Sequence, residues 1–569
     1  MKTPDIISPV KTIKDFDSVI KTGCKKVYVY HKPYQDEKGL KALIEMINKA
    51  KELNLEFYIK FKGNIKESDI KKTKNFMEFI ENTPINGILI NSLDILEFIK
   101  NKKLPFKIFI DSGLNLHNLA GIEFVGLFNS IDNYNITEEI YIKNLAKIRK
   151  YTKKSLSIDS DNLSWIAEEI IKSKTVDIIL IKGDFESPKK LLDGILLVEK
   201  ILEDPKSYKN KKLPFKNPDH NYYRSNHFSC EFLSSTGKDF KFTGNIQQFN
   251  WKFNRTKLTK SIATKNIPAL TLRLTGLEQI NSLKGYIKKL KFNPVYAVEY
   301  GEILSTADLS RQSFNKIIEK VKKECFDLGI KLQLSTPRIL NERDFDRVYE
   351  YVKLLCIQSP YPSSIVINNL GYWSAIINDT DFDKLNIELG QGLNLLNSTS
   401  ISCLTNQYPV SCVDLSNLWD IEDIKLCINN IKKKIPDKKL TIAGSIRVPS
   451  LGLCPLNNDS AILSRLSCTA PCHKGNYAIT DPSQGKTFPF TVDGFCRMHL
   501  FHPKILDLFN HIKYLENLGI NEFVADLSGL SHELVPVLLT RFLNSVSEEN
   551  YINDPDFEHD MYRIKKTTL

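Results

Sequence analysis

The sequence has none of the features of a membrane or secreted protein. Its 569 residues contain no uncharged apolar run of 18 or more residues, whereas a membrane-spanning helix needs about 20. The first residues, MKTPDIISPVKTIKDF, have no apolar segment of the kind that a secretory signal requires. We therefore expect a cytoplasmic protein without a membrane span. In that reducing compartment, cysteines serve as metal ligands or as small buried apolar side chains rather than as disulfides.

Several catalytic and metal-binding motifs are also absent. No C-x-x-C pair occurs, so a redox dithiol and the paired knuckles of a zinc ribbon are not indicated. There is no G-x-S-x-G, and the nearest approach to H-E-x-x-H is HELVP at 532–536, which lacks the second histidine. No peptidase motif is therefore present, although Ser, His and Asp side chains can still converge from distant positions.

The chain is moderately basic. It has 79 Lys and Arg against 67 Asp and Glu, which gives a net charge of +12. This balance is compatible with a polyanionic partner such as RNA, but many lysines also simply solvate a protein surface.

Short β-branched runs alternate with amphipathic segments, the pattern of parallel-sheet βα units. The length exceeds what one hydrophobic core usually supports, so two or more domains are expected. In the first part of the chain about seven such units favour a βα barrel of the TIM type, with a doubly wound sheet as the alternative. The predicted strands lie at 25–33, 55–61, 86–91, 106–111, 154–160 and 176–183.

The same order of segments starts again near residue 268. Short matches pair the two copies: 27–29 with 295–297, 90–91 with 367–368, 113–115 with 392–394, 156–158 with 440–442, and 176–181 with 520–525. The offset rises only from 268 to 284 over the first four pairs and then jumps to 344. The fold class that this predicts is α/β, with two tandem TIM-type modules that arose by internal duplication and a cysteine-rich insertion in the second.

Four parts follow from this pattern. The segment between the copies is basic and contains Tyr222, Tyr223 and Phe228, which could stack on bases, although an ordinary solvated linker has the same composition. The predicted parts are a first module at 1–202, a basic linker or small β-rich insert at 203–267, a second module at 268–545 with the cysteine-rich segment 444–502, and a tail at 546–569.

Four of the eleven cysteines gather in the insertion of the second copy: Cys454, Cys468, Cys472 and Cys496. Their spacing, C-x13-C-x3-C-x23-C, is wide and irregular. A 4Fe-4S cluster accepts such a spread because its sulfides enlarge the cage that the thiolates surround, and structural zinc is the alternative. We therefore predict that these four thiols bind one metal centre.

The residues around these cysteines resemble the collagenase-like peptidase family (peptidase family U32). The runs TIAGSIRVPSLGLC, LSCTAPCHKGNYAI and FPFTVDGFCRMHLFHPKIL are similar to the family's cysteine region, with Cys468 and Cys472 at its C-x3-C pair and Cys496 at its late cysteine. Arg447 stands where many members have their first cysteine. SPVKTIKDFDSVIKTGCKKVYVY near the N-terminus, IELGQGLNLLN and LGINEFVADLSGLS are also similar to the family.

The resemblance implies an iron–sulfur enzyme that hydroxylates a pyrimidine in tRNA or ribosomal RNA without molecular oxygen, with prephenate as a source of the hydroxyl group. Related members hydroxylate a quinone ring. A peptidase is one alternative, and a zinc-stapled RNA-binding or assembly protein without catalysis is another.

Three further residues are candidates for the site. Arg447 and Arg497 flank the cysteines and could bind a carboxylate or a phosphate, or could instead cap strand ends. Gln391 follows a predicted strand, where barrels place their active sites. His499 and His502 could donate protons, but we expect them to be surface histidines.

Overall fold

The chain forms two compact units in the computed structural model. One comprises Met1–Thr236 with Asn341–Arg343, and the other Gly237–Leu340 with Asp344–Leu569. The structure describes residues 3–32, 36–61, 65–136, 142–160, 163–182, 185, 187–208, 241–243, 267–290, 294–302, 313–416, 420–431, 435, 437–451, 477–481 and 486–547. Most of the predicted linker, with Tyr222, Tyr223 and Phe228, most of the tail, and Cys454, Cys468 and Cys472 lie outside these ranges.

The first unit is a closed barrel of eight parallel strands. Each strand pairs with the next, and β1 also pairs with β8, which closes the ring. The strands are β1 (Asp5–Pro9), β2 (Lys26–Tyr30), β3 (Glu56–Lys60), β4 (Gly87–Ile90), β5 (Lys107–Ile110), β6 (Asn133–Asn135), β7 (Ser155–Asp159) and β8 (Ile178–Leu180).

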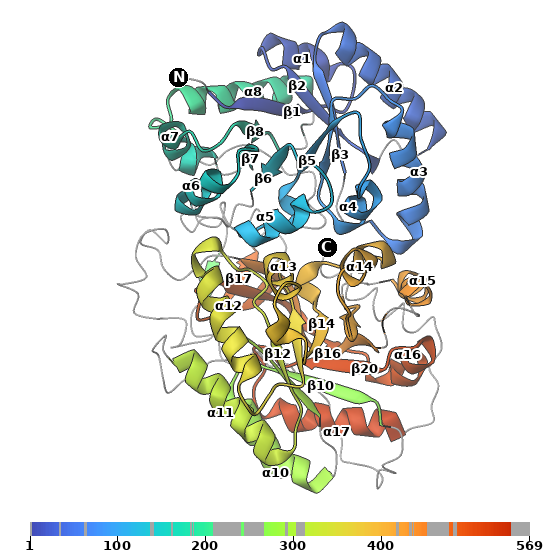
Figure 1. Ribbon diagram of the computed structural model, residues 1–569, viewed down its shortest axis with the longest axis vertical. Helices are drawn as coiled ribbons and strands as arrows, with labels where there is room; N and C mark the ends of the chain where they lie inside the picture. The colour runs from blue at the N-terminus through green and yellow to red at the C-terminus, as the bar shows by residue number, and fades with distance from the viewer. Residues whose placement is uncertain are drawn as a thin grey trace. The chain divides into compact units, whose positions relative to one another are not determined.

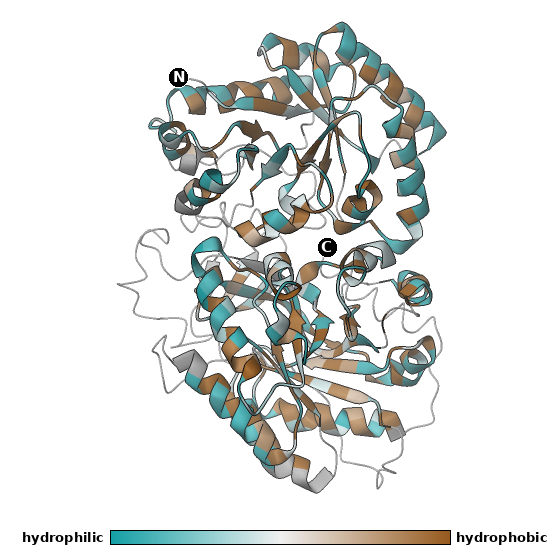
Figure 2. Cartoon of the chain, in the orientation of Figure 1, coloured by the Kyte–Doolittle hydropathy of each residue, from teal (hydrophilic) through white to brown (hydrophobic). Residues whose placement is uncertain are grey.

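Helices follow the strands of this barrel and cover its outside (Figure 1). α2 shows why: its buried residues Leu43, Met46, Ile47 and Ala50 recur at the spacing of one helical face. Figure 2 shows the result as teal on the outer sides of the helices and brown in the strands. The helices are α1 (Asp15–Lys21), α2 (Glu37–Glu52), α3 (Ile70–Glu81), α4 (Leu93–Ile99), α5 (Leu119–Gly126), α6 (Ile142–Tyr151), α7 (Leu163–Ser173) and α8 (Pro188–Glu203).

The second unit contains another closed ring of eight parallel strands. β10 to β16 follow in chain order, β15 pairs with β16, and β20 joins β16 to β10. The prediction of two TIM-type barrels is confirmed, and the doubly wound sheet is excluded because both sheets close. The ring strands are β10 (Ala269–Leu274), β11 (Val295–Glu299), β12 (Leu332–Ser335), β13 (Ser364–Ile367), β14 (Asn386–Leu389), β15 (Cys412–Asp414), β16 (Asp437–Leu451) and β20 (Glu522–Asp526).

In the second unit, as in the first, helices alternate with the strands of the ring along the chain. None of the helices that the structure describes in either unit is both long enough and apolar enough to cross a membrane. They are α10 (Leu277–Leu290), α11 (Ser313–Leu328), α12 (Glu342–Ile357), α13 (Leu370–Ile376), α14 (Ser398–Thr405), α15 (Ile421–Ile431), α16 (Ile512–Leu518) and α17 (Leu534–Ser547).

β16 is the element that carries the chain out of the second barrel. Its first part pairs in parallel with β20, and its second part pairs antiparallel with β19 (Met498–Asp507). Gly444 lies at the change, with φ +96°, and a Cβ there would lie 2.0 Å from the carbonyl oxygen of Asp526. Only glycine fits this approach. The small sheet continues through β18 (Lys486–Val492) and β17 (Tyr477–Asp481) to β9 (Lys241–Thr243).

The two barrels share the turn that follows their fifth strand. After β5 the 3-10 turn η3 (Ser112–Leu114) ends at Asn115, and after β14 the turn η6 (Gln391–Leu393) ends at Asn394. Both asparagines are left-handed, with φ of 54° and 52°. These are the residues that the sequence matched at an offset of 279, so the shared turn supports a duplicated module.

A close contact beside this turn is also repeated. A Cβ on Gly113 would lie 2.9 Å from Cβ of Asn91, and one on Gly392 would lie 2.7 Å from Cβ of Asn368. Each asparagine follows the fourth strand of its own barrel. The fourth and fifth loops therefore pack in the same way in both barrels.

Candidate active site at the mouth of the second barrel

Charged side chains collect where the parallel strands of the second barrel end. Arg273 of β10 donates from Nη2 to Oε2 of Glu299 at 2.5 Å and to Oε2 of Glu302 at 3.0 Å. Its Nε lies 3.8 Å from Oδ2 of Asp526, at the end of β20. Active sites of TIM barrels are built at this carboxyl-terminal end, so we take this mouth as the candidate site.

Glu302 is the acceptor that joins this group to β16. Arg447 binds both carboxylate oxygens of Glu302, with Nη2 donating to Oε2 at 2.8 Å and Nη1 donating to Oε1. The two side chains are 3% and 4% exposed. Burial would raise the pKa of Glu302, but the charges of Arg447 and Arg273 outweigh it and hold that pKa well below its ordinary value.

His499 links the pair to a second buried pair on the small sheet. Its Nδ1 lies 3.0 Å from Nη1 of Arg447, and its Nε2 lies 3.0 Å from Oδ2 of Asp493. A guanidinium can only donate, so Nδ1 is the acceptor and Nε2–H donates to the carboxylate. Asp493 also accepts from Nε of Arg497 at 2.6 Å. Despite burial, the charge of Arg497 and the hydrogen bond from His499 lower the pKa of Asp493.

The prediction that His499 and His502 are surface histidines is wrong. They are 2% and 0% exposed. Both belong to β19, which has β16 on one side and β18 on the other, so the strand is internal to its sheet. Residues 498–502 of β19 are all buried, so both faces of this part of the strand are covered, and no local pattern in the sequence marks that.

The two predicted arginines are brought to the mouth but are already paired. Arg447 is bound to Glu302, and Arg497 is bound to Asp493 and donates from Nη1 to the carbonyl oxygen of Ile339. As positioned, both guanidinium groups hold carboxylates of the protein. Their binding of an external anion stays a prediction.

Arg338 is an arginine of the mouth that the sequence analysis missed. It lies just beyond the end of β12, and its Nη2 donates to Oε1 of the predicted site residue Gln391 at 3.0 Å. Its Nε is 3.8 Å from Oε2 of Glu299, as far as Arg273 Nε is from Asp526 and farther than in the Arg447–Glu302 and Arg497–Asp493 pairs. Burial, together with the positive charges of Arg447 and Arg273, lowers the pKa of Arg338. A guanidinium held among other cations favours an incoming anion. The available signal was the alternating run IKLQLS at 330–335, which precedes Arg338 and contains β12 but was not predicted as a strand.

Gln391 is fixed by two partners. Besides accepting from Arg338, it donates from Nε2 to Oγ1 of Thr441 on β16 at 2.9 Å. Its counterpart in the first barrel is Ser112, at the start of the same turn. The amide therefore orients Arg338 at the mouth.

Cys496, one of the four predicted ligands, follows a turn beside the mouth. Its φ is +60°, and its backbone N–H donates to the carbonyl oxygen of Asp493 at 2.9 Å. The turn is held against the loop after β11, because Gly494 N–H donates to the carbonyl oxygen of Gly301 at 3.0 Å. The ring of Phe495 fills the space where a side chain at Gly301 would lie.

Cys496 differs from the other described cysteines in exposure. The remaining six, Cys24, Cys325, Cys356, Cys403, Cys412 and Cys427, are buried. Burial raises the thiol pKa of Cys24 to about 11 and that of Cys325 and of Cys356 to about 12, so these thiols stay protonated and are poor ligands. Cys454, Cys468 and Cys472 lie outside the described residues.

A second charged layer lies deeper in this barrel. Ligand atoms of Glu388, Cys412 and Glu522 lie within 4.8 Å of one another, a spacing that would suit a metal ion. The ammonium group of Lys439 is already there: it pairs with Glu388, lies 3.3 Å from Glu522, and donates to Oε1 of Gln333 at 3.1 Å. Lysine thus supplies the positive charge of this layer.

One protein-family model matches part of the chain. Residues 11–160 match the model described as peptidase family U32. The match falls on the first barrel and includes most of the N-terminal run that resembled the family, whereas the cysteine region lies outside it. No curated protein matches the chain.

Solved structures with some similarity include a U32 peptidase, with 8% identity over 33% of this chain and 96% of that one, at a TM-score of 0.26. N-acetylneuraminate lyase from Mycoplasma synoviae shows 12% identity over 35% and 74%, at 0.24. Orotidine 5'-phosphate decarboxylase from Lactobacillus acidophilus shows 10% over 34% and 98%, at 0.23. Similarities this weak carry no argument about activity.

Proposed function

Because residues 11–160 match the model of peptidase family U32, we propose that the chain is an enzyme of that family that hydroxylates a pyrimidine base in tRNA or ribosomal RNA. The reaction would not use molecular oxygen and would depend on a 4Fe-4S cluster. The observation that carries this proposal is the position of Cys496, a half-buried thiol beside the charged mouth of a barrel whose other described cysteines are buried.

Cys454, Cys468, Cys472 and Cys496 would hold the cluster. The described member of the set, Cys496, is half-buried rather than buried, which is compatible with this role. When bound, a 4Fe-4S cluster supplies one-electron transfer or Lewis-acid activation next to the barrel mouth.

The chain's own residues would bind and orient the hydroxyl donor. Arg338 presents a guanidinium whose donors suit a carboxylate such as that of prephenate, and Gln391 orients it from the side. The buried pairs around Glu302 and Asp493 would keep the wall of the site rigid, since each carboxylate is held by more than one donor.

His499 gives no support to a peptidase mechanism. Both of its ring nitrogens already lie at hydrogen-bond distance from Arg447 and Asp493. A general base for a Ser or Cys nucleophile needs one ring nitrogen directed at that nucleophile.

Iron and acid-labile sulfide in anaerobically purified protein test the cluster. We expect about four of each per chain in the wild type, a loss of both in Cys496→Ala, and retention in Cys24→Ala, the matched control in the first barrel. A wild-type protein without iron would overturn the proposal. Stoichiometric zinc would favour the zinc-stapled protein instead.

Nucleoside mass spectrometry tests the substrate. Total tRNA and ribosomal RNA from a deletion strain should lack a hydroxylated pyrimidine that the wild-type gene restores and the Arg338→Gln variant restores poorly. An unchanged nucleoside profile would remove RNA as the substrate, even if the cluster is present.

A further inference from the structure

A chain of hydrogen bonds crosses the mouth of the second barrel and joins residues from separate strand ends. Arg338 lies beyond the end of β12, and Gln391 begins the turn after β14. Thr441 belongs to β16, Asp414 ends β15, and Ser416 follows Asp414 closely. The chain runs in the order Arg338, Gln391, Thr441, Ser416 and Asp414. It therefore ties the guanidinium group of Arg338 to a carboxyl group that is only 8% exposed.

The end at Arg338 fixes the direction of the first links. A guanidinium group can only donate, so Gln391 turns its Oε1 toward Arg338, at 3.0 Å from Nη2. The amide nitrogen of Gln391 then faces Thr441 and donates to its Oγ1 at 2.9 Å. The threonine hydroxyl is thus the acceptor for the amide and keeps its own hydrogen for the next partner.

The end at Asp414 requires the same direction. Oδ1 of Asp414 accepts from Oγ of Ser416 and from the backbone N–H of Ser416, the latter at 2.9 Å. A hydroxyl has one hydrogen, so across the 2.9 Å between Oγ of Ser416 and Oγ1 of Thr441 the threonine is the donor. Oγ of Ser416 also accepts from the backbone N–H of Thr441 at 2.8 Å. A donor-only group at one end and an acceptor at the other therefore orient every link in the same sense.

We propose that Thr441, Ser416 and Asp414 are positioning residues, which act through Gln391 to hold the guanidinium group of Arg338 in the orientation that binds the carboxylate of a small organic acid. This inference rests on the proposed function, in which Arg338 binds the hydroxyl donor. Without the hydroxyl of Thr441, the amide nitrogen of Gln391 loses this acceptor and the amide is free to turn. Its N–H groups would then face those of Arg338, donor against donor.

Calorimetric titration of the full chain with prephenate tests the threonine. Thr441→Val keeps the shape of the side chain but removes its hydroxyl, and we expect prephenate to bind about three- to tenfold more weakly, the value of one hydrogen bond. Thr441→Ser restores the hydroxyl and should bind as the wild type does. The matched control is Thr540→Val, which removes a buried hydroxyl that donates to the carbonyl oxygen of Pro536 at 2.8 Å and should leave the affinity unchanged.

A double-mutant cycle with Arg338→Gln separates positioning from a merely structural role. If Thr441 acts only through the guanidinium group, Thr441→Val should have no further effect on prephenate affinity once Arg338 is replaced. The same fold-loss in both backgrounds would mean that the hydroxyl supports the barrel rather than Arg338, and would overturn the proposal.

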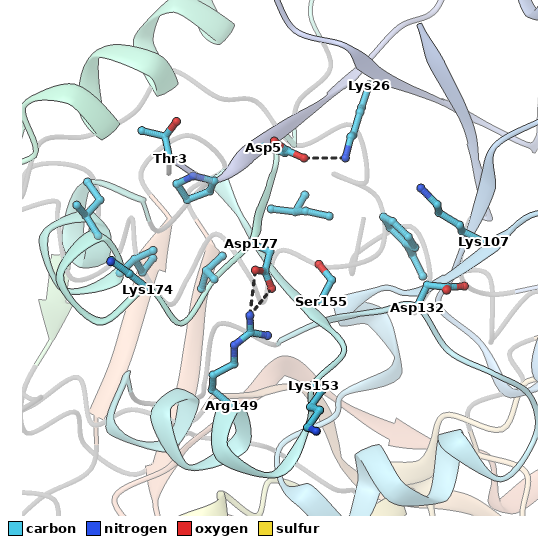
Figure 3. A pocket seen from close by; sticks show the side chains of 16 residues that line it. Thr3, Asp5, Lys26, Lys107, Asp132, Arg149, Lys153, Ser155, Lys174 and Asp177 are labelled. Atoms are coloured by element: carbon cyan, nitrogen blue, oxygen red, sulfur yellow. Dashed lines mark hydrogen bonds and ion pairs between the residues drawn. The ribbon is translucent and has the colours of Figure 1, made fainter. Parts of the chain in front are cut away.

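Ser416→Ala breaks the next link and tests the chain even if Thr441→Val does not fold. It should also weaken prephenate binding about three- to tenfold. Its control is Ser155→Ala in the first barrel: Ser155 lines a cavity there (Figure 3), and its Oγ accepts from Nδ2 of Asn133 at 2.9 Å.

Wild-type affinity in both Thr441→Val and Ser416→Ala overturns the proposal, as does a wild-type protein that does not bind prephenate. The nucleoside profile reports on the proposed function separately. Hydroxylated RNA with an affinity that ignores Thr441 would remove this inference alone. Prephenate binding that depends on Thr441, without hydroxylated RNA, would support it and remove only the RNA substrate.

Discussion

Arg447 and Glu302 show what a buried charge pair demands of its surroundings. The residues are 145 positions apart in the chain, and both side chains are nearly inaccessible. Such a pair contributes little net stability compared with apolar side chains, but removing one partner leaves an uncompensated buried charge. The pair therefore fixes the path of β16 past the barrel mouth more than it stabilises the fold.

Replacing Arg447 by methionine should destabilise the second barrel by about 3–5 kcal/mol, because Glu302 would keep its charge without its main partner. Urea unfolding followed by circular dichroism measures the change. Lys425→Met, which removes a surface pair with Glu422 at 2.9 Å, should cost less than about 1 kcal/mol. Equal effects of the two substitutions would contradict the assignment of Arg447 as the buried partner.

Arg338→Gln should weaken prephenate binding by roughly tenfold to a hundredfold, the value of one charge-assisted contact. It should not lower stability, since the guanidinium lies near Arg447 and Arg273, whose charges oppose its own. Titration calorimetry gives the affinity, and Arg541→Gln, at a surface pair with Asp507, is the control. An unchanged affinity would remove Arg338 from the proposed site.

At the scale of elements, the fifth strand and its turn are the best preserved part of the two barrels. The strand is followed by a 3-10 turn, a left-handed asparagine, and an asparagine cap, Asn118 or Asn397, that accepts from the backbone of the next helix. In the second barrel this turn also positions Gln391. Its geometry thus bears directly on the candidate site.

Gly392→Ala should destabilise the second barrel by about 1–3 kcal/mol, because the added Cβ would lie 2.4 Å from the carbonyl oxygen of Asn368. Gly113→Ala should cost less, since its nearest backbone atom is the carbonyl oxygen of Asn91 at 3.5 Å. Scanning calorimetry of both variants makes the comparison. A larger loss for Gly113→Ala would contradict it.

Asn394→Ala should cost about 1 kcal/mol, because alanine is disfavoured at φ of 52°, whereas Asn394→Gly should cost less. Asn115, with φ of 54°, should show the same order in the first barrel. Thermal melting of the four variants checks this. If alanine were tolerated as well as glycine at either position, the left-handed conformation would not be the constraint.

For the whole molecule, buried carboxyl groups in both barrels determine how stability changes at low pH. In the first barrel Asp111 pairs with Lys60 at 3.0 Å, and in the second Glu302 and Asp493 are held by arginines. Burial opposes ionisation, but the neighbouring cations lower the pKa of each of these three carboxyl groups. Asp414, whose pKa burial raises, acts in the opposite sense.

The free energy of unfolding should therefore fall as the pH drops below about 4. A lowered native pKa contributes stability that is complete above the unfolded values, near 3.9 for Asp and 4.3 for Glu, and is lost as the pH falls through the native value. Urea titrations at several pH values measure this, and Asp493→Asn should reduce the slope. Constant stability down to pH 3 would contradict the charged state of these pairs.

Local patterns in the sequence predicted the barrels and the repeated turn. The spacing of apolar residues fixes which face of a helix or strand is buried, and Asn115 and Asn394 could be matched because their turns are short and self-contained. The partners of Arg447 and Arg497 could not be predicted. No local pattern marks Glu302 or Asp493 as the carboxylates that meet them, and the burial of His499 follows only from the place of β19 in its sheet.

The sequence by itself determined that this chain makes βα units twice, and that the second copy carries an insertion with four cysteines. Helices and strands are marked by the spacing of apolar residues close together in the chain, and the insertion is visible as a jump in the offset between the two copies. Only the tertiary structure decided that the ring of strands closes, that Arg338 and Gln391 meet at its mouth 53 residues apart, and that the predicted anion-binding arginines are already held by carboxylates. The reason is physical: strand closure and buried ion pairs join distant segments, and their partners are selected by packing in three dimensions.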